Sequence, residues 1–107
     1  QSFWMFNTLV DLSVAYMNED RVILEIYDLK AHPEKMDPTR PVHSVADMDK
    51  YTWWDPVEVF FRQEAAVSKE PVSYALEMPW QWFEDHGVHV GDQCQWHGAD
   101  GCVMRTL

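Results

Sequence analysis

Five side chains that can bind a metal ion lie close together near the end of the sequence. They are His86, His89, Cys94, His97 and Cys102, in the pattern H-x2-H-x4-C-x2-H-x4-C. Imidazole and thiolate are the usual ligands of zinc, and short spacings suit a tetrahedral site. This pattern is not a standard zinc motif, however, and Cys94 and His97 would face opposite sides of a regular strand. A small zinc-binding domain is therefore an alternative, and buried cysteines with surface histidines and no cofactor are preferred.

Patterns typical of enzymes are missing from the rest of the sequence. It contains no G-x-S-x-G motif, no recognisable Cys–His pair and no glycine-rich loop of the kind that cradles phosphate. Carboxylate pairs such as Glu19-Asp20 and Glu84-Asp85 are frequent because the whole chain is acidic, so no single pair indicates acid–base catalysis. We therefore predict that the protein is not an enzyme.

A second group of candidate residues combines acidic and aromatic side chains. It comprises Asp47, Asp49, Tyr51, Trp53, Trp54 and Asp55. Carboxylates speed the encounter with a positively charged partner, and desolvated Trp and Tyr side chains supply much of the binding energy at protein interfaces. This segment is predicted to be a partner-binding surface. The alternative is that Trp53 and Trp54 fill the core in front of the helix that follows.

Length and charge narrow the class of protein further. The 107 residues suit one ordinary domain, predicted to span residues 1–107, and 18 acidic against 8 basic residues give a net charge of -10. Such a surface repels nucleic acid and membrane phosphates and attracts basic partners. We see no signal peptide and no apolar run near the ~20 residues of a membrane helix. A cytoplasmic protein with reduced thiols is expected.

The first half of the chain contains a hairpin and a loop. Residues 3–29 are predicted to form an antiparallel hairpin around the turn at residues 18–20. Because both faces of its strands are partly apolar, the sheet is expected to be covered on both sides. Residues 30–44, here called the proline loop, carry Pro33, Pro38 and Pro41, which exclude a helix interior or a central strand. Because long loops in small domains are often functional, the proline loop is a further candidate for partner contact.

The second half predicts the helices and the fold class. Asp55 followed by Pro56 is typical of a helix start, and a main helix is expected over about residues 56–68. Residues 72–107 are expected to form a strand, a short helix at about residues 79–86 and a hairpin. The predicted class is α+β, with a small, mostly antiparallel β-sheet or barrel and these two helices.

Several positions of residues 72–107 follow a familiar order. They are Met78-Pro79, Gly87, Gly91-Asp92, Asp100-Gly101 and Arg105. This order resembles the swapped-hairpin domain of the AbrB/MazE/SpoVT group. The resemblance implies a homodimeric barrel of interleaved hairpins that often binds DNA and, in MazE-like members, neutralises a toxin.

Local charge decides between the functions that these observations suggest. Residues 70–89 contain Glu70, Glu77, Glu84 and Asp85 and no Lys or Arg, although contacts to DNA phosphates need basic side chains. Duplex DNA binding is therefore not expected, and an AbrB-like transcriptional regulator is kept as an alternative. The favoured function is a non-catalytic acidic module that inhibits or neutralises a basic or nucleic-acid-binding partner. An antitoxin, an immunity protein and a phage inhibitor that mimics DNA charge are all examples of this class.

Overall fold

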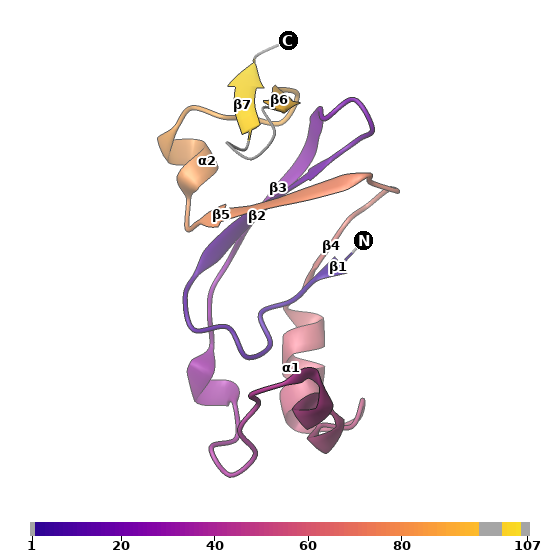
Figure 1. The fold of residues 1–107 in the computed structure, drawn as a ribbon, viewed down its shortest axis with the longest axis vertical. Coiled ribbons are helices and arrows are strands. Elements are labelled where there is room, and N and C mark those ends of the chain that lie inside the picture. The colour runs from indigo at the N-terminus through magenta and orange to yellow at the C-terminus, as the bar shows by residue number, and fades with distance from the viewer. Residues whose placement is uncertain (1, 97–101, 106–107) are drawn as a thin grey trace.

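An antiparallel sheet of three strands forms the middle of an elongated molecule. The computed structural model describes the backbone of residues 2–96 and 102–105 and the side chains of residues 2–95. The molecule extends 48 × 24 × 23 Å, with the sheet between two ends that carry the helices (Figure 1). The strand order in the sheet is β3-β2-β5. These strands are β2 (Leu12–Met17), β3 (Ile23–Leu29) and β5 (Tyr74–Pro79).

The predicted N-terminal hairpin is present but shorter than expected. β2 pairs antiparallel with β3, from Leu12 opposite Leu29 to Met17 opposite Ile23. The side chain of Asn18 closes the turn by accepting hydrogen bonds from the backbone N–H groups of Asp20 and Val22. Before β2 the chain forms only the two-residue strand β1 (Ser2–Phe3), which pairs with β4 (Ala66–Val67) instead of joining the hairpin.

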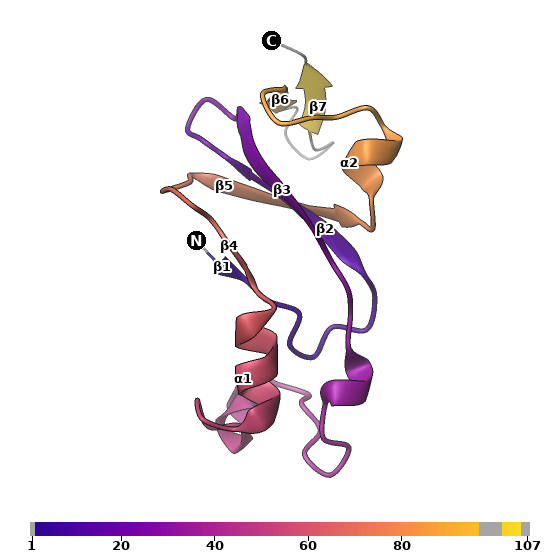
Figure 2. The same ribbon diagram turned by 180° about the vertical axis from the view of Figure 1, so that it is seen from behind.

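Both faces of β2 are covered, as the apolar residues on both of its sides predicted. Val14 and Tyr16 face β4, and the Tyr16 hydroxyl donates a 2.5 Å hydrogen bond to the Ala66 carbonyl. Ala15 lies on the opposite face, in a cluster that includes Phe83 of the short helix α2 (Trp82–Asp85). Figure 2 shows β1 and β4 on one side of the sheet and α2 on the other. Apolar burial on both faces is the main stabilising contribution to the middle of the fold.

The main helix, α1 (Pro56–Gln63), begins where the sequence predicted and ends earlier. The Asp55 side chain caps it by accepting a 2.9 Å hydrogen bond from the Val57 N–H. The helix ends before residue 68 because the chain extends to make β4. Two short 3₁₀ helices lie beside it, η1 (Pro33–Lys35) and η2 (Val45–Lys50). We call the end of the molecule that these three helices form the basal end.

The C-terminal segment differs from its prediction in two places. Pro79 is the last residue of β5 and not part of a helical turn, because the chain bends at Gln81, where φ is 59° and the N–H donates to Ser13 Oγ at 2.8 Å. Residues 88–90, where Val88 and Val90 alternate with His89 as in a strand, form no strand. They lead into a turn in which Asp92 Oδ2 accepts a 2.8 Å hydrogen bond from the His89 N–H. Gly87, with φ 65°, follows α2 as predicted.

The predicted fold class is confirmed. The structure is α+β, with one main helix, one short helix and antiparallel strand pairing throughout the described residues. The final hairpin pairs β6 (Gln93–Trp96) with β7 (Cys102–Arg105). The sequence Gly98-Ala99-Asp100-Gly101, which is typical of a hairpin turn, lies outside the described residues. The described strands make separate sheets and close no barrel. None of the described helices is long and apolar enough to cross a lipid bilayer.

Candidate functional site

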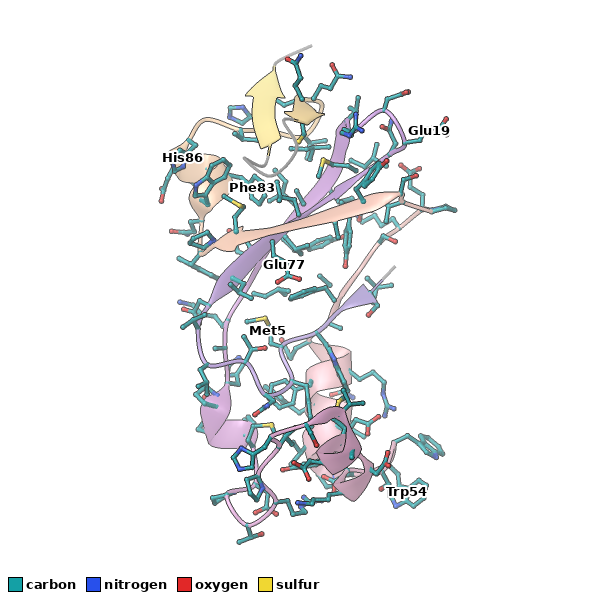
Figure 3. All side chains as sticks on the ribbon, in the orientation of Figure 1. Met5, Glu19, Trp54, Glu77, Phe83 and His86 are labelled. Carbon is teal, nitrogen blue, oxygen red and sulfur yellow. The ribbon has the colours of Figure 1, made fainter. Side chains whose placement is uncertain are left out.

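Two adjacent indole rings are largely exposed at the basal end. Trp53 and Trp54, here called the tryptophan pair, are 67% and 65% exposed and lie between η2 and α1. Their ring centroids are 5.6 Å apart and their planes meet at 87°, an edge-to-face arrangement. Figure 3 shows Trp54 projecting away from the body of the molecule. The alternative that these rings fill the core is therefore not what the structure shows, and exposed Trp is enriched where proteins bind other proteins.

Arg62 of α1 holds the first ring of the pair in place. Its Nη2 donates a 2.6 Å hydrogen bond to the Trp53 carbonyl, and its guanidinium carbon lies 5.9 Å from the Trp53 ring centroid. Its Nη1 lies 3.5 Å from a carboxylate oxygen of Glu58, one helical turn earlier. These contacts fix the loop between η2 and α1, so that less conformational entropy is lost when a partner binds the pair.

The two acidic residues before the tryptophan pair differ in their surroundings. Asp47 accepts a 2.8 Å hydrogen bond from the His43 N–H and pairs with Lys50 at 3.3 Å, and these contacts hold the pKa of its carboxyl below the usual value. Asp49 is exposed and makes no ion pair or side-chain hydrogen bond to any described residue. Asp47 therefore organises the start of η2, and Asp49 is the carboxylate available to a partner.

Tyr51 and Asp55 lie beneath the predicted surface instead of forming part of it. Tyr51 is 5% exposed, packs with Phe61, and donates its hydroxyl proton to the Arg40 carbonyl at 2.9 Å. Asp55 uses one oxygen to cap α1 and the other to pair with Arg40 Nη1 at 2.6 Å. Both residues therefore belong to the packed interior of the basal end, and neither is placed to contact a partner.

Arg40 ties the proline loop to the main helix. Its guanidinium contacts carboxylates on both sides, Asp37 at 3.0 Å and Asp55 at 2.6 Å, and lies 4.1 Å from the Tyr51 ring centroid. The Arg40 hydrogen bond holds the pKa of Asp55 below its usual value, with a further contribution from the Val57 N–H. Hydrogen bonds from Thr39, followed by Arg40, lower the pKa of Asp37. The loop is therefore a packed part of the basal end.

Acid should weaken the ion pairs around Arg40 and lower the stability of the fold, because the pKa of Asp55 is lower in the folded protein than in the unfolded chain. The unfolded carboxyl returns to its ordinary pKa of about 3.9, so between the two pKa values the unfolded chain binds more protons. The stabilising contribution of the ionised Asp55 carboxyl is complete above a pH of about 4. It is lost as the pH falls through the pKa of Asp55 in the folded protein. We expect the Arg40→Gln variant to lose less stability than the unmodified protein over this acid range, measured by denaturant unfolding at stepped pH.

Arg21→Gln is the matched control, because it removes the same charge from a residue with no ion pair among the described residues. Its stability should fall with acid as steeply as that of the unmodified protein. An equally steep acid loss in Arg40→Gln would show that Arg40 does not set the pKa of Asp55.

The described residues of the alternative zinc site are not grouped to hold a metal ion. The His86 ring stacks on Trp82 at 4.1 Å and its Nδ1 lies 2.8 Å from the Trp82 carbonyl oxygen. His89 is exposed and Cys94 is buried and disulfide-bonded, so the reduced thiol expected there is not found. His97 lies outside the described residues, as does the side chain of Cys102. No three His, Cys, Asp or Glu side chains among those described are grouped to hold a metal ion.

Sequence reasoning missed the two arginines and a neighbouring apolar hollow. The contacts by which Arg40 reaches Asp55 and Arg62 reaches the Trp53 carbonyl span fifteen and nine positions, so no local pattern reveals them. An open hollow of about 350 Å³ lies beside η2 and includes Val45, which is 83% exposed. Its other main apolar walls are Trp4, Phe6, Val42 and Met48. In the sequence, the only signal for this hollow is the group of apolar residues that come before the main helix.

The fold and site define a small α+β protein with an exposed aromatic pair at one end. Comparison with protein families matches residues 1–96 to DUF192, described as "Uncharacterized ACR". Since this match covers most of the sequence, the chain belongs to the DUF192 family. Searches of curated proteins and of solved structures found no match.

The resemblance to the AbrB/MazE/SpoVT group is therefore wrong. The DUF192 match runs through residue 96 and takes in most of the segment that carried the resemblance. The strand before Met78-Pro79 also pairs with β2 of the N-terminal hairpin, whereas the group's domain builds a barrel from interleaved hairpins. The homodimer was expected only from that resemblance, so nothing now supports it.

Proposed function

We propose that the chain is a non-catalytic, acidic protein-binding module and that the tryptophan pair anchors a basic protein partner. The observation that carries this proposal is the exposure of two neighbouring indole rings whose loop is fixed by Arg62. Large exposed apolar rings are unfavourable in water, and covering them with a partner recovers that free energy. Rings held in one geometry before binding also lose little entropy on complex formation.

Charge supports the choice of partner. The net charge of -10 attracts a positively charged protein over a distance of about one Debye length, roughly 8 Å at physiological salt. The exposed carboxylate of Asp49 lies in the same segment as the tryptophan pair. Covering the basic surface of a nucleic-acid-binding partner would inhibit or neutralise it, because the same surface contacts phosphates. Duplex DNA itself is not proposed as a partner.

A comparative pull-down tests the proposal. The unmodified protein and a Trp53→Ser, Trp54→Ser double variant are used as bait in an extract of the source cells, and the captured proteins are identified by mass spectrometry. We expect a basic protein to be enriched by the unmodified chain, to be lost with the double variant, and to bind the unmodified chain directly once purified. Equal capture by both baits, or capture of acidic proteins alone, would contradict the proposal.

A further inference from the structure

Cations of this chain lie over many of its own aromatic rings. Among the described side chains, five such contacts occur, with distances to the ring centroid from 4.1 to 5.9 Å. The pairs are Arg21 with Tyr74, Lys30 with Trp80, Lys35 with Phe60, Arg40 with Tyr51, and Arg62 with Trp53. A cation above a ring is attracted by the negative face of its π system.

Trp54 departs from this arrangement. The exposed large aromatic side chains among those described are Trp53 at 67%, Trp54 at 65% and Tyr74 at 45%. Arg62 lies over Trp53 and Arg21 lies over Tyr74, but no described cation lies over Trp54. Trp54 thus presents an exposed ring, of the residue type that binds cations best, without a cation from its own chain.

The neighbours of Trp54 suit a positively charged ligand. Asp49, a few residues earlier in the same segment, offers a carboxylate that no described residue neutralises, and the plane of the Trp53 ring meets that of Trp54 at 87°. Arg62 shows how a guanidinium can sit beside one ring of the tryptophan pair: it lies 5.9 Å from the Trp53 ring centroid while also contacting a carbonyl and the carboxylate of Glu58. A planar guanidinium can stack on a ring and donate hydrogen bonds at the same time.

We infer that Trp54 receives an arginine side chain of the basic partner, which stacks on its open face beside Trp53. This inference rests on the proposed function and adds the chemical class of the side chain that the tryptophan pair recognises. The guanidinium is preferred to a lysine ammonium because it is less strongly hydrated and loses less on leaving water. The net charge of -10, with the exposed carboxylate of Asp49 in the same segment, attracts such a positively charged side chain.

Binding of a labelled oligo-arginine peptide to the full chain tests this inference at physiological salt. The unmodified protein should bind oligo-arginine more tightly than oligo-lysine of the same length. Trp54→Leu, which keeps an apolar side chain but removes the ring, should weaken oligo-arginine binding by about threefold to about thirtyfold. Trp54→Tyr should restore part of the affinity, because tyrosine keeps an aromatic face.

Tyr74→Leu is the matched control, since it removes an exposed ring that Arg21 already covers. It should leave the affinity unchanged. Equal binding of the two peptides, or equal binding by Trp54→Leu and the unmodified protein, would overturn the inference and leave only general charge attraction. The proposed function is judged separately, because a basic partner can be captured through both tryptophans without an arginine at Trp54.

Discussion

Replacement of Phe83 by alanine is expected to lower the free energy of unfolding by about 3–5 kcal/mol. Phe83 is 1% exposed and packs against Ala15 and Ile23 of the central sheet and Val88 of the following turn. Figure 3 shows its ring between α2 and the sheet. Removing the ring leaves a cavity that short, connected elements can fill only partly. Since small domains are stable by only about 5–15 kcal/mol, much of the total would be lost.

Denaturant unfolding followed by circular dichroism measures this loss, and Val90→Ala is its control. Val90 lies in the same segment but is 59% exposed, so its truncation should change the free energy of unfolding by less than about 0.5 kcal/mol. A loss below about 1 kcal/mol in Phe83→Ala would mean that α2 does not pack tightly on the sheet in solution.

Replacement of both Trp53 and Trp54 by alanine is expected to abolish tight partner binding while the protein stays folded. A buried Trp at an interface contributes roughly 2 kcal/mol or more, so each single change should speed dissociation by about thirtyfold. Because both rings are largely exposed in the free chain, the melting temperature should change by only a few degrees at most. Surface plasmon resonance with the identified basic partner, together with calorimetry of each variant, gives both quantities.

Tyr74→Ala controls for the loss of an exposed aromatic ring away from the basal end and should leave dissociation unchanged. A large fall in melting temperature in Trp53→Ala would assign that ring to the fold and not to binding. Asp49→Asn should change the association rate instead of the dissociation rate. It should slow association at low salt, and this effect should fade as the salt concentration rises. Asp49 suits this purpose better than Asp47, whose hydrogen bond to the His43 N–H also organises the loop.

Local interactions explain the parts of the fold that the sequence determined by itself. The turn after β2 depends on the side chain of Asn18, which bonds to backbone groups two and four residues ahead. The start of α1 depends on Asp55 and Pro56, and its capping bond spans two residues. Gly87 follows α2 in the left-handed conformation that glycine adopts without steric cost. Contacts this short are encoded by neighbouring residues, so a pattern can reveal them.

The family resemblance failed because its signals were of this local kind. A Gly-Asp turn and an Asp-Gly pair are typical of many small β-proteins, and they do not specify which strands pair. β5 pairs with β2, which lies about sixty residues earlier in the chain. Which strand pairs with which depends on how distant apolar faces fit together, and a short motif contains no information about its remote partner.

Tertiary structure alone decided which residues of the candidate surface are exposed. Tyr51, Trp53 and Trp54 look alike in the sequence, yet Tyr51 is buried and the two tryptophans are not. Tyr51 is drawn inward by packing against Phe61 and by its bond to the Arg40 carbonyl, eleven residues away. Trp53 is held at the surface by Arg62. Aromatic character predicts that a ring leaves water or binds a partner, but only distant contacts decide which of the two occurs.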